Sequence, residues 1–183
     1  NTIIKVFENN DQKVVLAAPT GRAAKRMSET SNKEAKTIHR LLEMGFGMDS
    51  DELTFMKNEE DPIDADVVIL DEVSMVDIVL MYSLLRAIKS GTRLLIVGDS
   101  DQLPSVGAGN VLKDLIDSEV INTVRLNEIF RQAQESMIVV NAHKINKGEP
   151  LKLNVKGKDF FFIKKEGDDI PVSYTHLTLP TTP

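Results

Sequence analysis

Short hydrophobic runs that end in polar or glycine-containing loops recur along the chain. Three of them are almost continuously apolar, at residues 13–18 (KVVLAA), 67–70 (VVIL) and 93–97 (RLLIV). Continuous apolar character over four to six residues is typical of strands that are buried on both faces of a sheet. These runs therefore predict buried strands, and the patterns at 120–126 and 159–163 predict two further strands.

Helical patterns separate the predicted strands. Hydrophobic spacing and helix-forming composition predict helices at 22–29, 37–44, 77–89, 110–116 and 135–147, with glycine after several of them as the stop. Residues 47–66 are acidic and irregular, which predicts a surface excursion with a short extended piece at 53–56. Because buried strands alternate with helices, we expect an α/β fold with a parallel sheet covered on both faces.

Polar groups follow directly on the three most apolar predicted strands. They are Thr20-Gly21-Arg22, the acid pair Asp71-Glu72, and residues 99–102. Ligands of open parallel sheets bind beyond the carboxyl ends of the strands. The pattern therefore predicts a ligand site at that end of the sheet.

Composition narrows the chemistry that this site can support. The 183 residues are 42% hydrophobic and include three His and no Cys, so disulfides, thiolate zinc sites and Cys nucleophiles are excluded. Any metal should be a hard cation on oxygen ligands, such as Mg²⁺. No run of about 18 apolar residues and no signal-peptide pattern is present, which predicts a cytoplasmic protein without membrane contact.

Charge is unevenly distributed along the chain. The formal net charge of −6 argues against a general nucleic-acid coat, yet residues 13–40 carry seven Lys/Arg against two Glu. Contacts with the phosphates of a nucleic acid are therefore expected in that segment. A solvated helix face would give the same composition.

The acid pair suits nucleoside triphosphate hydrolysis. Asp71 can hold Mg²⁺, usually through its waters, and Glu72 can orient or deprotonate the attacking water. Gln102 can sense a γ-phosphate or position that water. The alternatives are an acid pair that caps the next turn and a loop around Gln102 that is only a turn.

Several motifs in order resemble the RecD-like helicases of superfamily 1, the type of the exodeoxyribonuclease V alpha subunit. The matching segments are APTGRAAKRM (18–27) for motif Ia, TIHRLL (37–42) for the next DNA-contact segment, DEVSM (71–75) for Walker B, GDSDQLPSVGAGNVL (98–112) for motif III and LNEIFRQA (126–133) for motif IV. The resemblance covers nearly all of residues 1–165. It implies a parallel-sheet, RecA-like P-loop NTPase motor domain that uses ATP and Mg²⁺ and travels 5′ to 3′ on single-stranded DNA.

The same resemblance implies roles for individual residues. Mg²⁺ is expected at Asp71, water activation at Glu72, coupling of the nucleotide state to DNA at Gln102, and stabilisation of transition-state charge at Arg131. The residues implied in contacts with DNA are Pro19, Thr20, Gly21, Arg22, Thr37 and His39. Their alternatives are ordinary ones: Arg131 in a surface ion pair, residues 19–22 as a strand-to-helix turn, Thr37 as a helix N-cap and His39 as a surface residue.

One expected motif is missing from the sequence. A phosphate loop requires G-x-x-x-x-G-K-[ST], and Gly157-Lys158 lacks both the earlier glycine and the following Ser or Thr. We expect the chain to begin just after its own phosphate loop, with 1–9 as the remainder of the helix that follows the loop. Residues 172–183 (VSYTHLTLPTTP) resemble the in-frame translation of a sequencing adapter and are excluded from the fold.

The predicted organisation has three parts: a truncated first motor domain at 1–126, the start of a second at 127–169, and a non-native tail at 170–183. The expected function of the parent protein is ATP-dependent unwinding of DNA in repair or recombination, on single-stranded DNA and duplex junctions, alone or with other recombination subunits. The isolated chain is expected to lack ATPase activity. The alternatives are a non-catalytic interaction module and the motor of a relaxase or nuclease assembly.

Overall fold

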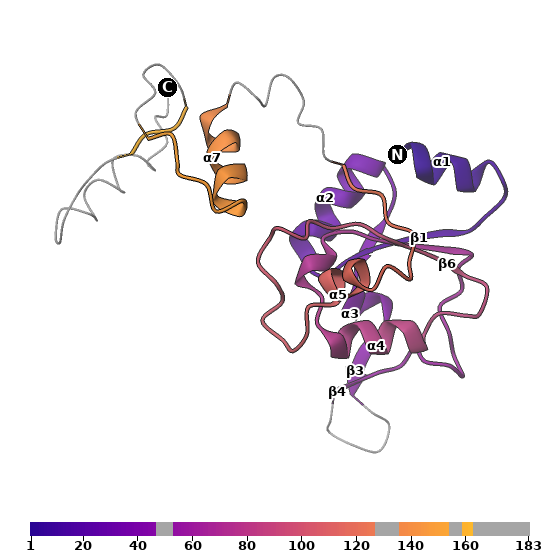
Figure 1. Ribbon diagram of the computed structural model, residues 1–183. Helices are drawn as coiled ribbons and strands as arrows, with labels where there is room; N and C mark the ends of the chain where they lie inside the picture. Colours follow the sequence, from indigo (N-terminus) through magenta and orange to yellow (C-terminus); the bar gives the residue numbers. More distant parts are fainter. Residues whose placement is uncertain (47–52, 127–135, 154–158, 163–183) are drawn as a thin grey trace, which may run out of the picture. The chain divides into compact units, whose positions relative to one another are not determined.

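Residues 1–46, 53–126, 136–153 and 159–162 are described by the computed structural model (Figure 1). The chain divides into two compact units, Asn1–Val124 and Arg125–Pro183. No helix among the described residues is long and apolar enough to cross a membrane.

A four-stranded sheet lies at the centre of the first unit. Its strands are β1 (Val14–Ala18), β2 (Ala35–Thr37), β5 (Val67–Leu70) and β6 (Arg93–Ile96), in the order β2-β1-β5-β6. All three neighbouring pairs are parallel. The α/β class, the parallel sheet and the strands predicted at 13–18, 67–70 and 93–97 are thereby confirmed. Within the described residues β1 and β5 are the central strands, and β6 lies at an edge of the sheet.

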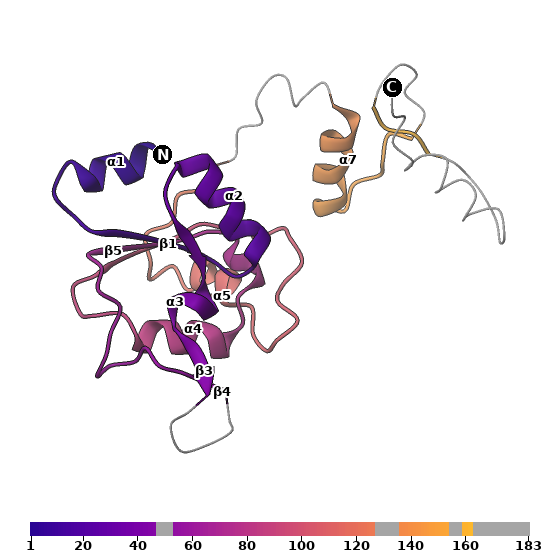
Figure 2. The same ribbon diagram turned by 180° about the vertical axis from the view of Figure 1, so that it is seen from behind.

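Helices cover both faces of this sheet. On one face, the helices α1 (Thr2–Glu8) and α2 (Gly21–Ser31) contribute Ile4 and Met27 to a cluster with Leu16, Val67 and Ile69. Figure 2 shows α2 beside β1 from behind. On the other face, α3 (Ile38–Leu41), α4 (Ile78–Arg86) and α5 (Val111–Asp117) pack on the alternate residues of the same strands. Because successive side chains of a strand point to opposite faces, a continuous apolar run is what such a sheet requires.

Side-chain caps begin three of these helices. Thr20 accepts a hydrogen bond from the Ala23 amide at 3.2 Å, and Asp77 accepts one from the Leu80 amide at 2.8 Å. Thr37 accepts one from the Arg40 amide at 3.2 Å. An N-cap satisfies one of the amides that have no partner inside the helix. The cap also fixes where the chain leaves β1 and β2, and so where the loops after these strands lie.

Several predicted elements differ from the structure. The helix predicted at 37–44 is only α3, because the chain adopts a left-handed conformation at Glu43 (φ 53°) and turns into a hairpin of β3 (Met44–Phe46) and β4 (Leu53–Phe55). The helix predicted at 77–89 ends at Arg86 with Ala87 as its C-cap. Gly91 is not that cap but lies in the following turn, with a φ of 92°.

Two predicted strands are wrong. Residues 120–126 form no strand, and their large apolar side chains are exposed, Val124 by 87% and Leu126 by 94%. Residues 159–162 form none either, and Ile163 lies outside the described residues. A strand requires a neighbour for its backbone groups, and the described residues supply none in either place.

The second unit contains the helix α7 (Met137–Asn146), which confirms the helix predicted at 135–147. Asp159 accepts hydrogen bonds from the Ser136 hydroxyl and from the Met137 amide, the second at 2.6 Å. The buried Asn141 side chain pairs with both backbone groups of Lys152, at 2.9 and 3.1 Å. Polar side chains therefore hold the segments that follow α7 against this helix.

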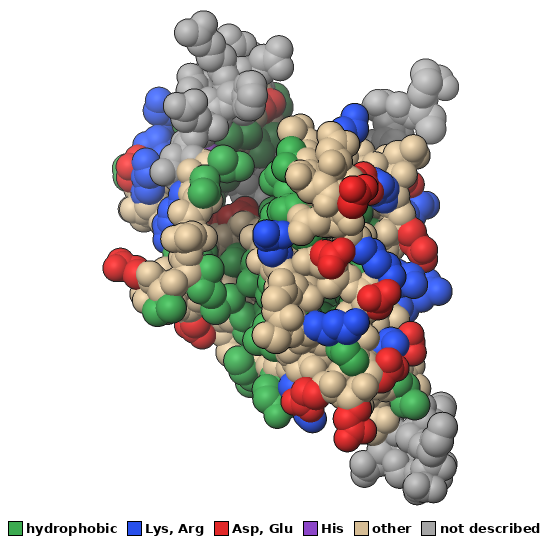
Figure 3. All heavy atoms as spheres, turned by 90° about the vertical axis from the view of Figure 1, so that its right-hand side faces the viewer, with side chains coloured by type: hydrophobic (Ala, Val, Ile, Leu, Met, Phe, Trp, Pro, Cys, Tyr) green, Lys and Arg blue, Asp and Glu red, His purple; other side chains and the backbone are tan. Residues whose placement is uncertain are grey.

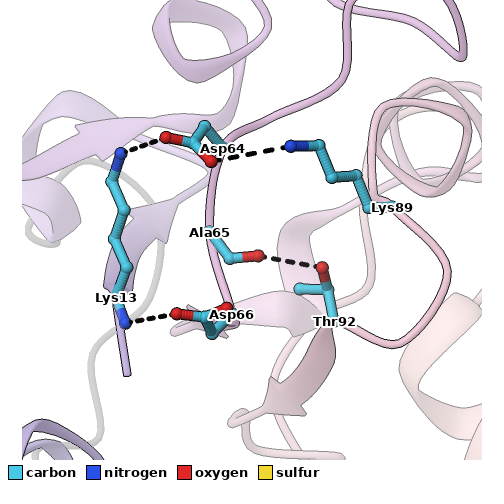
Figure 4. Close-up of polar contacts among 6 residues, drawn as sticks. All are labelled: Lys13, Asp64, Ala65, Asp66, Lys89 and Thr92. Atoms are coloured by element: carbon cyan, nitrogen blue, oxygen red, sulfur yellow. Dashed lines mark hydrogen bonds and ion pairs between the residues drawn. The ribbon is translucent and has the colours of Figure 1, made fainter. Parts of the chain in front are cut away.

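A group of hydrogen bonds and ion pairs connects the amino ends of β1, β5 and β6 (Figure 4). Asp64 pairs with the Nζ atoms of Lys13 at 2.6 Å and Lys89 at 3.5 Å. The hydrogen bond from Lys13, with the positive charges of both lysines, lowers the pKa of the Asp64 carboxyl below its usual value. Asp66 accepts a bond from the Lys13 amide at 2.7 Å, and Thr92 donates one to the carbonyl between the two aspartates at 2.9 Å. These contacts lie at the amino ends of the strands. The opposite end of the sheet, where the strands have their carboxyl ends, is named the carboxyl edge.

Candidate functional site

The acid pair lies at the carboxyl edge, where β5 ends. The amide of Asp71 donates to the Ala17 carbonyl at 3.0 Å, so Asp71 still continues the pairing with β1. Glu72 then adopts a left-handed backbone conformation, with φ 57° and ψ 38°. A non-glycine residue in this region costs free energy, and such conformations are concentrated at functional sites. The sharp turn leaves both carboxylates half-buried at the edge of the sheet.

A role in capping the next turn explains the side chain of Asp71 but not that of Glu72. Asp71 Oδ1 accepts a hydrogen bond from the Glu72 amide at 3.0 Å. Glu72 occupies the N-cap position of the short 3₁₀ helix at Val73–Met75, but its side chain makes no capping bond. Neither carboxylate forms an ion pair with a cation among the described residues. Within the described part of the chain, no capping bond or ion pair therefore explains the position of the Glu72 side chain.

A cavity of about 460 Å³ adjoins the acid pair. It lies among α1, α2 and the ends of β5 and β6, and its lining residues are Asn1, Ile3, Ile4, Arg26, Met27, Thr30, Ser31, Ile69, Asp71, Glu72, Leu95 and Val97. Its volume is within the range of pockets that bind small molecules. Asp71 and Glu72 therefore face a space that can hold a ligand.

The metal chemistry of the pair is limited by its surroundings. Within the part of the chain that the structure describes, no three His, Cys, Asp or Glu side chains lie close enough to hold a metal ion together. Mg²⁺ is commonly bound through one or two carboxylates, with waters and substrate phosphates as its other ligands. Asp71 and Glu72 fit that mode and not a cage made entirely of protein ligands.

Gln102 lies at the same edge but outside the cavity. It follows β6 in an exposed turn, where its amide donates to the Asp99 carbonyl at 3.2 Å and its Nε2 lies 3.5 Å from Asp99 Oδ2. Gln102 therefore follows a strand that ends at the carboxyl edge, but it is not among the residues that line the cavity. Arg131 lies outside the described residues.

The loop after β6 packs closely against the segment that follows the acid pair. A Cβ atom at Gly98 would lie 2.8 Å from Leu112 Cδ2 and 3.2 Å from the Val73 nitrogen. One at Gly107 would collide with the side chain of Asp77, the N-cap of α4. These glycines therefore let the loop of motif III touch the segment that follows Glu72.

We expect Gly98→Ala to destabilise the fold by about 1–3 kcal/mol, because overpacking at a close contact forces the backbone to move. Chemical denaturation of the purified chain measures this change. Gly21→Ala is the matched control, because a Cβ there meets nothing within 4 Å and Gly21 is the first residue of α2. Equal stability of the two variants would contradict the packing described here.

The residues implied in DNA contacts lie at the ends of β1 and β2. These strands are neighbours, with Ala18 paired to Thr37, so the loop of Pro19–Arg22 and the start of α3 lie side by side. Arg22 is exposed, with no ion-pair partner among the described residues. Thr37 caps α3, as its alternative role predicted.

His39 adds an aromatic contact to this group. Its ring lies 5.9 Å from that of Phe55, centroid to centroid, so His39 connects the end of β2 to the hairpin. This contact could not be predicted from the sequence, because β2 is short and polar and was not predicted as a strand. Arg26, which lines the cavity, was missed as a site residue because its Lys/Arg-rich segment was assigned to DNA as a whole.

The parallel sheet, with helices on both faces and the acid pair at its carboxyl edge, defines the class of fold, a RecA-like α/β domain. Residues 1–108 match the AAA domain family, and the chain belongs to that family. It is 43% identical over 147 residues to the ATP-dependent RecD2 DNA helicase of Deinococcus radiodurans, covering 80% of this chain and 19% of the relative. It is 39% identical over 121 residues to the RecBCD enzyme subunit RecD of Mycobacterium tuberculosis, covering 57% of this chain and 20% of that relative.

A solved structure supports the fold. The chain matches a structure of Pif1 helicases on forked double-stranded DNA with a TM-score of 0.52 and 23% identity, covering 82% of this chain and 41% of the other. The resemblance to RecD-like helicases is confirmed by the named relatives. The chain spans about a fifth of the length of these two relatives.

Proposed function

We propose that this segment is part of the motor of an ATP-dependent DNA helicase that travels 5′ to 3′ on single-stranded DNA and acts in repair or recombination. The observation that carries the proposal is the position of Asp71 and Glu72, which end a buried parallel strand and line a ligand-sized cavity. Carboxylates in this position serve metal-assisted hydrolysis of a nucleoside triphosphate.

Each residue of the site has one role in this proposal. Asp71 holds Mg²⁺, through water, and Glu72 orients and deprotonates the attacking water. Gln102 couples the nucleotide state to DNA from the loop after β6, which packs against the segment following Glu72. Arg131 stabilises the charge that develops on the transferred phosphate, as a planar and permanently charged side chain can.

The DNA strand is proposed to run over the ends of β1 and β2. Arg22 and the amide of Gly21 contact backbone phosphates, since glycine allows close approach and Arg forms charge-assisted hydrogen bonds with phosphate. Pro19, Thr20, Thr37 and His39 complete this surface. Because DNA and nucleotide would occupy neighbouring parts of one sheet edge, small movements of the strand-end loops can couple them.

The isolated 183-residue chain is proposed to hydrolyse no ATP. It contains no G-x-x-x-x-G-K-[ST], whose amides and Lys supply most of the preorganised contacts with the phosphates. We also propose that residues 1–126 form a truncated first motor domain, that 127–169 begin a second, and that 170–183 are a non-native tail. Other recombination subunits are proposed as partners, since several relatives carry the name of a RecBCD subunit.

The test is strand unwinding by the intact protein, meaning this segment with the residues that flank it at its own locus. With ATP and Mg²⁺, we expect release of a labelled strand from a duplex that has a 5′ single-stranded tail and little release from one with a 3′ tail. A preference for the 3′ tail would contradict the direction of travel. ATP-independent DNA binding without unwinding would favour a non-catalytic module.

A further inference from the structure

One basic side chain lines the cavity together with the acid pair. Arg26 lines the cavity from α2, together with Asp71 and Glu72 from the end of β5, and no other lining residue is Lys or Arg. Arg26 follows Arg22 by one helical turn. Thus α2 begins beside the proposed DNA surface, with Arg22 in its first turn, and Arg26 one turn later lines the cavity.

The Arg26 guanidinium has no polar partner in the part of the chain that the structure describes. Among the described residues it forms no hydrogen bond or ion pair, so it is not directly paired with either carboxylate. Nearby lysines are paired instead: Lys25 lies 3.9 Å from Glu29, and Lys33 contacts Glu8. Figure 3 likewise shows Lys and Arg mingled with Asp and Glu over one side of the molecule. An unpaired arginine beside a cavity is available to a ligand.

We propose that Arg26 binds the phosphates of the nucleoside triphosphate in this cavity. This inference rests on the proposed function and adds a phosphate-binding residue outside the acid pair. The two carboxylates alone would repel a polyanion. Once Mg²⁺ neutralises them, the charge of Arg26 leaves the cavity positive, and its planar fork matches two phosphate oxygens.

A phosphate of the DNA backbone is the alternative ligand for Arg26, because it offers the same anionic oxygens. The acid pair disfavours it, because a phosphodiester binds Mg²⁺ far more weakly than a triphosphate does and so brings less positive charge to offset Asp71 and Glu72 at close range. The cavity also has apolar walls, including Ile4, Met27 and Leu95, which suit the rest of a nucleotide more than an extended strand. We therefore assign Arg26 to the nucleotide and Arg22 to DNA.

The experiment is an NMR titration of the 183-residue chain with ATP and Mg²⁺, repeated with Mg²⁺ and tripolyphosphate, adenosine, or a short oligothymidine. We expect weak binding of ATP and tripolyphosphate. Arg26→Gln should weaken both by about tenfold or more, because a hydrogen bond to a charged group is lost. It should leave oligothymidine binding unchanged. Lys25→Gln is the matched control, since it removes the same charge from the same helix turn outside the cavity.

Three results would overturn the assignment. One is an Arg26→Gln variant that binds ATP as the Lys25→Gln variant does. Another is a variant with tighter Mg²⁺ binding and unchanged ATP binding, which would make Arg26 only a countercharge for the acid pair. The third is absence of ATP binding in the millimolar range by the unsubstituted chain. Failure of the proposed function is seen separately, in the unwinding assay of the intact protein.

Discussion

Glu72→Gln in the intact protein is expected to lower the kcat of ATP hydrolysis by roughly two to four orders of magnitude, the usual contribution of a general base. The amide keeps the size and hydrogen-bonding reach of the side chain but cannot accept a proton. ATP binding should persist, because Glu72 makes no capping bond or ion pair that its loss would disturb. Steady-state ATPase kinetics and equilibrium binding of ATP separate the two effects.

Asp77→Asn is the control for this experiment. It removes one negative charge from a half-buried aspartate that caps α4 and does not line the cavity. Asn is as good an N-cap as Asp, so the helix should remain. If both variants lost the same fraction of activity, the assignment of the general base to Glu72 would be wrong.

Leu84→Ala is expected to destabilise the fold by about 2–5 kcal/mol, the usual cost of truncating a fully buried leucine. Leu84 is 0% exposed in the core between α4 and the sheet. The loss comes from apolar contacts and from the cavity left behind. Urea denaturation of the purified chain measures the change in the free energy of unfolding.

The next residue of the same helix provides a matched control. Leu85 is 53% exposed, so Leu85→Ala removes the same atoms with much less burial, and we expect a change below about 1 kcal/mol. Helix propensity changes equally in both variants and cancels in the comparison. Equal destabilisation would mean that α4 does not pack on the sheet through the face described here.

The strand at 67–70 could be predicted because burial on both faces leaves no room for polar residues, and all four of its residues are buried. The strand at 93–97 was predicted from the same pattern, although β6 lies at an edge of the described sheet and its residues are only half-buried or exposed. The runs at 67–70 and 93–97 are apolar at nearly every position, and the structure places them side by side in the sheet. The edge strand β2 could not be predicted, since its sequence AKT has neither length nor hydrophobicity. It forms because the neighbouring strand β1 supplies its hydrogen-bonding partners.

Hydrophobic pattern alone misled the prediction at 120–126. Val120, Ile121 and Val124 have the composition of a strand, but strand formation depends on a partner elsewhere in the chain. The helix α3 is likewise shorter than its hydrophobic pattern predicted. The left-handed turn at Glu43 ends this helix before the glycines that were predicted to stop it.

The acid pair was predictable as a site because two carboxylates directly follow a buried strand. The three-dimensional details of the site could not be predicted. The sequence cannot show that Glu72 lacks a capping bond or that Gln102 lies outside the cavity. Arg26 escaped notice for a related reason. Its importance depends on which of seven basic residues in 13–40 has no partner and lines the cavity.

The most direct test of the central claim is the ATPase activity of the intact protein with and without single-stranded DNA. If Asp71 and Glu72 serve a DNA-dependent motor, Mg²⁺-dependent ATP hydrolysis should rise severalfold or more when single-stranded DNA is added. Removing Mg²⁺ should abolish it. An intact protein that binds single-stranded DNA but hydrolyses no ATP in its presence would contradict the account.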